Sequence, residues 1–329
     1  MDVLSDVLKN VKLDGAVFYN GEFSAPWNFR SPASHKVAPY LSHPGKHVII
    51  YHLLLQGRAN ARVEGDDESR ITLGPGEVVI FPHGNAHILG NGHSQLVDNE
   101  PELQRIFRQG SKLAQGGGGG EVTRFICGYM TCDPRLSQTF LSGLPPVFKV
   151  NIGNDAWGEW LTQSIRFSAN EADASHAGSD AVLAKLSEVL FVETLRRFIA
   201  ELPANASGWL AGARDPEVGK ALSHMHRSPA HPWTVAELAR ESGVSRSVLA
   251  DRFRHFLGEP PMTYLTRWRL QLGAQMLSST SYSVAQVASE VGYESEPAFN
   301  RAFKREFGKP PARFRTESKN GKAAMAAAR

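Results

Sequence analysis

One pattern occurs twice in the C-terminal third of the chain, and no other feature restricts the fold as strongly. In the first copy a helical segment contains the small residue Ala239, and Gly243 follows four positions later. In the second copy Ala288 and Gly292 have the same spacing. A short turn and an arginine-rich segment follow each glycine. A small residue lets two helices cross closely and glycine accepts the positive φ of a turn, so the pattern predicts two helix-turn-helix motifs in tandem.

The first copy has recognisable helix ends. Thr234 is a candidate N-cap with Glu237 as its capping-box partner, and Ser245 can cap the second helix. Leu249 and Phe253 are the expected buried anchors of that helix. The residues that then point outward are Arg246, Ser247, Ala250, Asp251 and Arg254.

The second copy has three aromatic anchors on its second helix, Phe299, Phe303 and Phe307. Pro297 fits the first turn of this helix, where the backbone N–H has no partner to lose. The turn between the helices is one residue longer than in the first copy. The outward residues are Glu296, Asn300, Arg301, Lys304 and Arg305.

The segment between the copies and the distribution of charge both agree with DNA binding. Leu265, Trp268 and Leu272 recur at helical spacing within residues 262–278, which predicts a rigid connecting helix. Two recognition helices in adjacent major grooves must lie about 34 Å apart. From Asp215 onward there are seventeen Lys and Arg against eleven Asp and Glu, a net charge of +6, whereas the preceding part has −3. The basic excess thus lies with the repeated motif.

Side-chain chemistry suggests different roles for the outward residues. Arg246 and Arg301 can form bidentate hydrogen bonds with guanine, and Asn300 can pair with adenine. An outward arginine contacts phosphate more often than a base, so both roles stay open. Asp251 and Glu296 either accept a hydrogen bond from cytosine N4 or orient a neighbouring arginine.

The chain resembles the AraC/XylS family of bacterial transcription regulators over nearly its whole length. The similarity is most specific in R-W-R-L-Q-L-G-A-Q-M-L (267–277), V-A-S-E-V-G-Y-E-S-E-P-A-F-N-R-A-F-K-R-E-F-G-K-P-P (287–311) and P-A-R-F-R (311–315). The resemblance implies that residues 245–256 and 295–307 form helices that enter successive major grooves. By position, it implies base-facing roles for Ser247, Ala250, Asp251, Glu296, Pro297, Asn300 and Arg301. Ala250 is shorter than the polar side chains common there, so the first copy is expected to add affinity more than sequence discrimination.

The first part of the chain has the pattern of a β-sheet domain. Extended apolar segments at 47–55, 71–73, 77–81 and 124–129 are separated by turns rich in glycine and proline. This alternation predicts an antiparallel sheet or barrel. Residues 91–121 interrupt the pattern and contain five consecutive glycines, which indicates a mobile insertion. We favour the interpretation that this insertion is a tolerated surface loop. The alternative is that it controls access to a pocket.

Residues 76–87 have the spacing G-x5-P-x-G-x2-H. This segment resembles the second motif of cupin barrels, and the sequence around it looks like the cupin-type sensor domain of one AraC subgroup. The resemblance implies a regulatory domain and not an enzyme. The first cupin motif, H-x-H followed by Glu, is absent at His52. We therefore expect His52, His83, His87 and Cys127 to line a ligand pocket without a metal or cofactor. If the domain did bind a metal ion, the three histidines would be its available ligands.

Cys127 and Cys132 are the only cysteines, which is typical of a protein in a reducing cytoplasm. Five positions apart on an extended strand, they face opposite sides, so a disulfide would require a turn at residues 128–131. Buried, inert thiols are favoured over a redox switch.

Two further helices are predicted after the sheet region. One spans 155–168, with Trp157, Leu161 and Ile165 on a single stripe, and the other spans 181–202. The second has a long apolar stripe that packs on the barrel or on a second protomer, and the family resemblance favours dimerisation. The expected organisation is a cupin-like domain at 1–150, a helical coupling segment at 151–214, a DNA-binding domain at 215–316 and a disordered tail at 317–329.

These observations predict an α+β multidomain protein, with an N-terminal cupin-like β-barrel followed by an all-α tandem helix-turn-helix domain. We expect a cytoplasmic, homodimeric transcription regulator that binds double-stranded promoter DNA, contacts RNA polymerase and responds to an unidentified small molecule or stress signal. No apolar run approaches the roughly 20 residues of a membrane span. Two alternatives stay open: a metal-dependent cupin enzyme fused to a DNA-binding module, and a DNA-binding protein whose barrel is only an oligomerisation scaffold.

Overall fold

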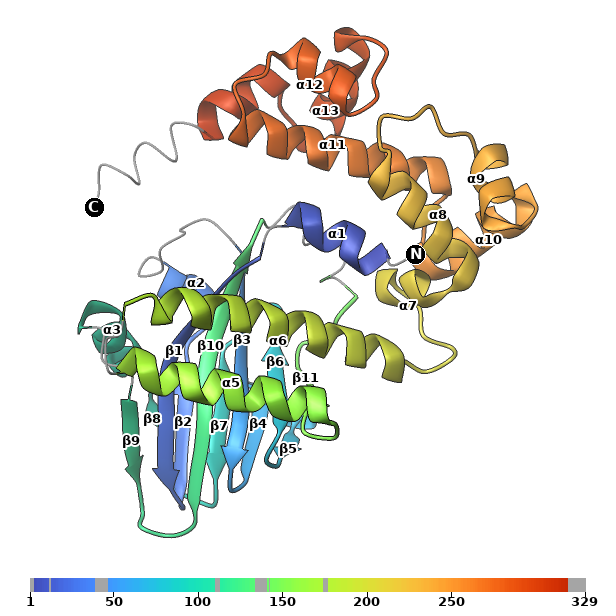
Figure 1. The fold of residues 1–329 in the computed structure, drawn as a ribbon. Coiled ribbons are helices and arrows are strands. Elements are labelled where there is room, and N and C mark those ends of the chain that lie inside the picture. The colour runs from blue at the N-terminus through green and yellow to red at the C-terminus, as the bar shows by residue number, and fades with distance from the viewer. Residues whose placement is uncertain are drawn as a thin grey trace. The chain divides into compact units, whose positions relative to one another are not determined.

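The computed structural model of the 329-residue chain describes residues 3–11, 13–38, 47–109, 113–133, 141, 143–173 and 177–318. The chain divides into two compact units. One unit contains residues 12–201, and the other contains residues 202–329 together with residues 1–11. The predicted order of a sheet-rich part followed by an all-helical part is confirmed (Figure 1). The first helix of the chain, however, belongs to the C-terminal unit.

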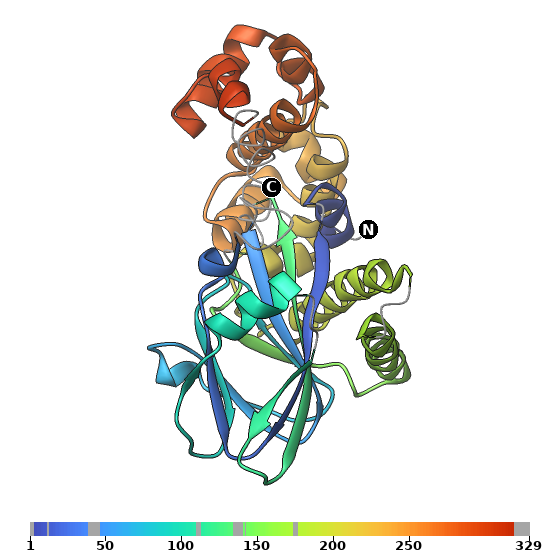
Figure 2. The same ribbon diagram turned by 90° about the vertical axis from the view of Figure 1, so that its left-hand side faces the viewer.

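Two sheets form the body of the N-terminal unit (Figures 1 and 2). The larger has the strand order β11 (Phe148–Asn151), β6 (Glu77–Phe81), β3 (His47–Gln56), β10 (Val122–Cys132), β1 (Asp14–Ser24) and β9 (Leu113–Gly117). The smaller has the order β5 (Ile71–Leu73), β4 (Ala59–Val63), β7 (His87–Asn91), β2 (Trp27–Ser31) and β8 (Val97–Asp98). The pairs β1–β9 and β2–β8 are parallel, and the others are antiparallel. The four strands predicted from the sequence are confirmed as β3, β5, β6 and β10.

The hydrophobic core of this unit draws on strands of both sheets. In β2 the alternation of the strand buries Trp27 and Phe29 and leaves Asn28 between them partly exposed. These two rings pack with Phe125 of β10, and Phe81 of β6 belongs to the same core. The remaining short elements are α2 (Ser34–Val37), the 3-10 helix η2 (Asp67–Ser69) and α3 (Glu100–Gln109).

Helices α5 (Ala156–Asp173) and α6 (Ser179–Glu201) pair with each other, and α6 packs on β1 outside the larger sheet (Figure 2). A Cβ atom on Gly15 of β1 would lie 2.8 Å from the Ala184 carbonyl oxygen, so this approach requires glycine. Leu161 and Ile165 are buried as predicted, but the prediction that Trp157 shares their stripe is wrong because its side chain is exposed. Eight helical residues turn through about 80° more than two full turns, which moves Trp157 away from the face of Ile165.

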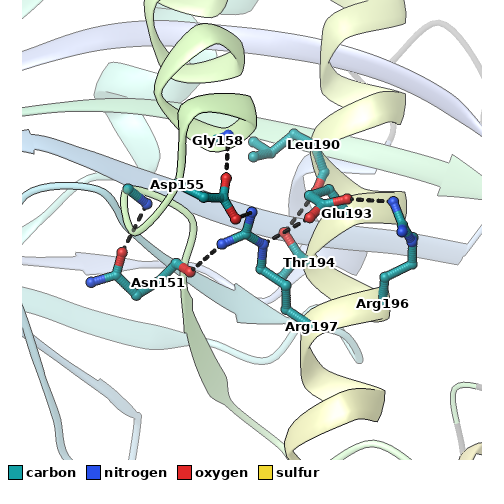
Figure 3. A network of polar contacts seen from close by, with 9 residues as sticks. Asn151, Asp155, Gly158, Leu190, Glu193, Thr194, Arg196 and Arg197 are labelled. Carbon is teal, nitrogen blue, oxygen red and sulfur yellow. Dashed lines mark hydrogen bonds and ion pairs between the residues drawn. The ribbon is translucent and has the colours of Figure 1, made fainter.

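Arg197 joins three elements of this unit (Figure 3). Its Nε donates a hydrogen bond to Glu193 Oε1 at 2.8 Å, and its terminal nitrogens donate to Asp155 Oδ2 at 2.8 Å and to the Asn151 carbonyl at 3.1 Å. Asp155 also caps α5, because its Oδ1 accepts the Gly158 amide at 2.8 Å. Arg197 therefore ties the end of β11 and the start of α5 to the C-terminal half of α6.

The expectation of a mobile glycine run is wrong, because these glycines form hydrogen bonds beside the turn between β1 and β2. The Gly118 amide donates to the Ser24 carbonyl at 2.9 Å, and the Gly120 amide donates to the Ala25 carbonyl at 2.8 Å. A Cβ atom on Gly117, where φ is 118°, would lie 1.9 Å from the Ser24 carbonyl oxygen. Glycine is needed here for close approach, and the hydrogen bonds offset the entropy of ordering it.

The C-terminal unit is entirely helical in the residues that are described. Its helices are α1 (Val3–Val11), α7 (Trp209–Arg214), α8 (Pro216–Arg227), α9 (Val235–Ser242), α10 (Arg246–Leu257), α11 (Pro261–Ser279), α12 (Val284–Glu290) and α13 (Glu296–Phe307), followed by helical residues 311–318. Within the described ranges of both units, no helix is long and apolar enough to cross a membrane.

The helical segment expected at 151–214 is divided between the two units. Helices α5 and α6 belong to the N-terminal unit, whereas α7 belongs to the C-terminal unit. Of the tail expected at 317–329, residues 317 and 318 are helical and the rest lie outside the described residues.

Candidate nucleic-acid interface

Both predicted helix-turn-helix motifs are present, and their first helices end with the same backbone hydrogen bond. In the first motif the Val244 amide donates to the Ala239 carbonyl at 3.0 Å, and in the second the Tyr293 amide donates to the Ala288 carbonyl at 2.8 Å. The glycine before each donor has a positive φ, 80° in the first motif and 86° in the second. Both alanines are buried where the helices meet. The repeated residues therefore produce repeated geometry.

The helix starts of the first motif follow the prediction with one exception. Thr234 is the N-cap of α9 and accepts the Glu237 amide at 3.1 Å, and Ser245 is the N-cap of α10 and accepts the Val248 amide at 3.3 Å. The prediction that the Glu237 side chain completes the capping box with the Thr234 amide is wrong, because the Glu237 carboxylate lies 3.0 Å from His231 Nε2 instead. The caps confirm the helix boundaries that position α10.

Helix α10 presents a polar outer face. Leu249 and Phe253 are fully buried, which confirms them as anchors. Asp251 forms an ion pair with Arg254 at 3.2 Å, an arrangement in which the acid orients an arginine. Of the predicted outward residues, Ala250 is half-buried. The other four are exposed: Arg246, Ser247, Asp251 and Arg254.

Helix α13 is anchored by its aromatic residues. Phe299 and Phe303 are fully buried, and Phe307 is half-buried beside Phe314 with the ring centroids 5.7 Å apart. Pro297 lies in the first turn as predicted. The outer face contains Glu296, Pro297, Arg301, Lys304 and Arg305 as exposed residues, with Asn300 half-buried and its Nδ2 3.5 Å from Glu296 Oε1.

Some cations on these helices are engaged within the protein and others are not. Arg254 is paired with Asp251, and Arg252 is paired with Asp215 and Glu217. Across the described residues, no hydrogen bond or ion pair engages the side chains of Arg246, Arg301, Lys304 and Arg305. These four side chains are therefore available to phosphate or to base edges.

Helix α11 connects the motifs, as predicted, and is about 28 Å long from its 19 residues. Trp268 is buried in it and stacks on His226 of α8 with centroids 4.2 Å apart. Arg269 donates from Nε to the Pro229 carbonyl at 2.6 Å and from a terminal nitrogen to the His231 carbonyl at 2.7 Å. These contacts hold the connecting helix against the segment that leads into the first motif.

Three of the predicted pocket residues lie together inside the N-terminal unit. His52 Nε2 is 2.8 Å from His87 Nε2, His87 Nδ1 is 2.9 Å from the Asn85 carbonyl, and the Cys127 sulfur contacts His52 Nδ1. A carbonyl only accepts, so His87 Nδ1 donates, His87 Nε2 accepts from His52 Nε2, and His52 Nδ1 accepts from the thiol. Burial lowers the pKa of His52 and lowers that of His87 to about 4, so both rings are neutral at pH 7.

In this chain two imidazole nitrogens meet, those of His52 and His87, which is fewer than the three or four protein ligands of a typical metal centre. No group of three or more His, Cys, Asp or Glu side chains in the described ranges is arranged to hold a metal ion. His83 lies apart and contacts the Leu144 carbonyl at 3.0 Å. The cavity beside His52 and His87 measures about 10 Å³, room for one water at most. Cys127 and Cys132 are both buried on β10 without a disulfide.

A sheet-rich unit followed by two helix-turn-helix motifs with unpaired basic side chains defines a DNA-binding protein of the helix-turn-helix class. Comparison with known families agrees with both parts. The family model described as Cupin matches residues 2–200, and the model described as Helix-turn-helix domain matches residues 238–317.

Three relatives match most of the chain. An AraC-like transcription regulator of Streptomyces antibioticus is 34% identical over 82% of this chain and 87% of its own length. The HTH-type transcriptional regulator AlkR of Acinetobacter baylyi is 29% identical over 97% of this chain and all of its own. The RCS-specific HTH-type transcriptional activator RclR of Escherichia coli is 30% identical over 96% of this chain and 97% of its own. The chain belongs to the AraC-type family of helix-turn-helix transcription regulators and has a cupin-like N-terminal domain.

Proposed function

We propose that this regulator reads promoter DNA with α10 and α13 together, in two successive major grooves. The observation that supports this most directly is the set of unpaired cations on the outer faces of both helices. Arg246 on α10 and Arg301 on α13 have exposed side chains without a partner among the described residues, as a group that contacts nucleic acid requires.

In this proposal α13 makes most of the base contacts, and α10 contacts mainly phosphate. On α13, Arg301 and Asn300 form hydrogen bonds with base edges, while Lys304 and Arg305 contact phosphate. On α10, Arg246 contacts phosphate, and Arg254 does so in the orientation that Asp251 sets. Short side chains such as Ser247 and Ala250 leave α10 with fewer groups that can distinguish bases.

The test begins with sequencing of the genomic fragments that the full chain retains, which yields the operator. Affinity for that operator and for random DNA is then measured for Arg301→Ala. We expect a loss of about 1–3 kcal/mol on the operator and a much smaller loss on random DNA. The matched control is Arg313→Ala, because Arg313 is exposed but paired with Glu317 at 2.8 Å. Equal losses on both DNAs would instead make Arg301 a phosphate contact.

We further propose that the protein is a homodimer through the outer faces of α5 and α6. Trp160 and Phe167 of α5 are 52% and 64% exposed, and Trp157 stacks on Trp160 with centroids 4.9 Å apart. Val182 and Val189 of α6 are also exposed. Large apolar side chains gathered in this way are typical of a surface that another protein covers. Sedimentation of Trp160→Glu against wild type tests this, and an unchanged molecular mass would exclude this face.

The N-terminal unit is proposed to act as a sensor for a small molecule, in the cytoplasm, with RNA polymerase as the protein partner at the promoter. Support for a sensor over an enzyme comes from the buried histidine–cysteine chain, in which every polar atom has a protein partner. A thermal-shift screen of the full chain is the direct test, because a ligand that binds the folded state raises the unfolding temperature. Turnover of any such ligand would support the enzyme alternative.

A further inference from the structure

A cavity of about 300 Å³ lies on the outer face of the smaller sheet, which is a size at the lower end of small-molecule sites. The alternation of β4 buries its two alanines in the core, so Asn60 and Arg62 point to the outside. The strand register places Asn60 beside Gly90 of β7 and Gly90 beside Asn28 of β2. These outward positions form the floor of the cavity, and α6 packs on the other sheet.

The floor is hollow because β7 has a glycine at this point. A Cβ atom on Gly90 would lie 1.7 Å from Asn28 Oδ1, so the Asn28 amide occupies the place that a side chain of residue 90 would take. Asn28 Nδ2 donates to the Gly92 carbonyl at 3.1 Å and to the Ser94 hydroxyl at 3.2 Å. Asn28 therefore holds residues 92–94 in place, and these residues form part of the cavity wall.

The charged side chains that line the cavity are cations. Arg62 and Arg70 are positive at any physiological pH, and of the described residues that line the cavity none is Asp or Glu. Arg70 is exposed, and no hydrogen bond or ion pair within the described part of the chain engages its side chain. Arg30 on the neighbouring strand is different, because Glu64 and Asp98 both pair with it. The positive charge at the cavity is thus not neutralised at Arg70.

Arg62 has one partner, which leaves part of its guanidinium available. A terminal nitrogen of Arg62 is 3.0 Å from Asp67 Oδ1, and the Asp67 side chain is 80% exposed. Asp67 belongs to η2, and Figure 2 shows η2 (pale blue) on the opposite side of the unit from the green helices α5 and α6. A guanidinium has five N–H donors, and an exposed ion pair is weak, so Asp67 competes only weakly with a second anion.

We propose that this cavity binds a compact organic anion, a carboxylate or a phosphate monoester. Its anionic group pairs with Arg62 and Arg70, and its carbon part contacts Ile88 or Leu96, the apolar side chains that also line the cavity. The role of such an anion as the effector rests on the proposed function of the N-terminal unit as a sensor. The buried histidine pair then has no part in binding the ligand.

The experiment uses the full chain and four probes that share a benzene ring, followed by ligand-observed NMR at pH 7.5. Benzoate and phenyl phosphate are anions, benzamide is neutral and benzamidine is a cation. We expect each anion to bind about three- to tenfold more tightly than benzamide, and benzamidine to bind most weakly. The tighter of the two anions identifies the anionic group that the cavity prefers. Benzamide binding as tightly as both anions would overturn the anionic class of ligand.

Three variants locate the site. Arg70→Gln should weaken both anions about three- to tenfold without changing benzamide, and Asp67→Asn should tighten them about twofold because it removes the competing carboxylate. Arg58→Gln makes the same change at an exposed arginine that does not line the cavity, and it should have no effect. Anion binding that Arg70→Gln leaves unchanged, or that Arg58→Gln weakens equally, would overturn the site.

The site and the proposed function fail separately. Probe binding is measured without DNA, so its absence rejects the anion site and leaves the reading of DNA untouched. The double variant Arg246→Ala/Arg301→Ala should lose operator selection and still bind the anions, which shows that they do not occupy the DNA-binding helices. If the tighter anion binds at Arg70 but changes operator affinity by less than about twofold at saturation, the effector role is rejected and the binding site stands.

Discussion

The Ser223 hydroxyl donates a 2.6 Å hydrogen bond to Asp6 Oδ2, which lies 217 positions earlier in the chain. Both side chains are buried, and Arg227 Nε is 3.5 Å from the same carboxylate oxygen. Beside them Val3, Leu4 and Val7 of α1 are buried. The helix that precedes the first strand of the sheet unit is thus a structural part of the helix-turn-helix unit. The Asp6 carboxylate, through its contacts with Ser223 and Arg227, fixes the position of α1 on α8.

The first prediction concerns this contact. Asp6→Ala leaves the buried Ser223 hydroxyl without its acceptor and should destabilise the C-terminal unit by about 1–3 kcal/mol. Asp6→Asn keeps an acceptor for Ser223 and removes only the charge opposite the half-exposed Arg227, so it should cost less than about 1 kcal/mol. Urea unfolding of both full-length variants, followed by hydrogen exchange of α8, measures the difference. Equal losses in the two variants would assign the effect to the ion pair.

The sequence predicted those features that depend on neighbours along the chain. The strands, the helix-turn-helix pairs and anchors such as Phe253 and Phe303 follow from periodicity and turn residues, which act over a few positions. The partner of Asp6 was missed because α1 lies far from Ser223 in sequence. Glu237 illustrates the same limit. Its carboxylate could accept a hydrogen bond from the N-cap amide or contact His231, and in the structure it contacts His231.

The candidate sensor site was predicted less well, for a physical reason. A motif match directed attention to His52 and His87, but the inside of the unit is filled around them and leaves about 10 Å³. The larger cavity on the outer face of the smaller sheet is made by separate segments of the chain, and only the strand register places Asn60, Gly90 and Asn28 side by side. The alternation of β4 was the one local signal for this face.

A second prediction follows from the buried histidines. Burial holds the pKa of His87 near 4 and lowers that of His52, whereas an unfolded histidine titrates near 6.5. Because protons bind the unfolded state first, stability is complete above about pH 6.5 and falls as the pH drops from there toward 4. The loss for each histidine approaches about 1.4 kcal/mol per pH unit.

Urea unfolding between pH 7.5 and 5 measures this dependence. His87→Gln keeps an acceptor for His52 but cannot take up a proton, so its stability should fall less steeply with acid than that of wild type. His93→Gln makes the same substitution at an exposed position and should reproduce the wild-type slope. Identical slopes in all three proteins would show that the histidine pair does not control acid stability.

The third prediction separates the two recognition helices. If Arg246 of α10 contacts phosphate, Arg246→Ala should weaken operator and random DNA equally and reduce the slope of log affinity against log salt by about one. Arg301→Ala should change the preference for the operator with a smaller effect on that slope. Binding titrations at four salt concentrations distinguish the two outcomes. A loss of operator preference from Arg246→Ala would show that α10 reads bases as well.

The fourth prediction uses two adjacent arginines that share the acceptor Glu193 (Figure 3). Arg197 is 16% exposed and also holds Asp155 and the Asn151 carbonyl, whereas Arg196 is 66% exposed and, among the residues that the structure describes, bonds only to Glu193. Arg197→Met keeps most of the side-chain volume but removes three charge-assisted hydrogen bonds, so the N-terminal unit should lose about 1.5–3 kcal/mol of unfolding free energy. Arg196→Met should change it by less than about 0.5 kcal/mol, because solvent screens an exposed pair. Urea unfolding with hydrogen exchange at the start of α5 tests both, and similar losses would mean that Glu193, not the bridge to β11, is the group that matters.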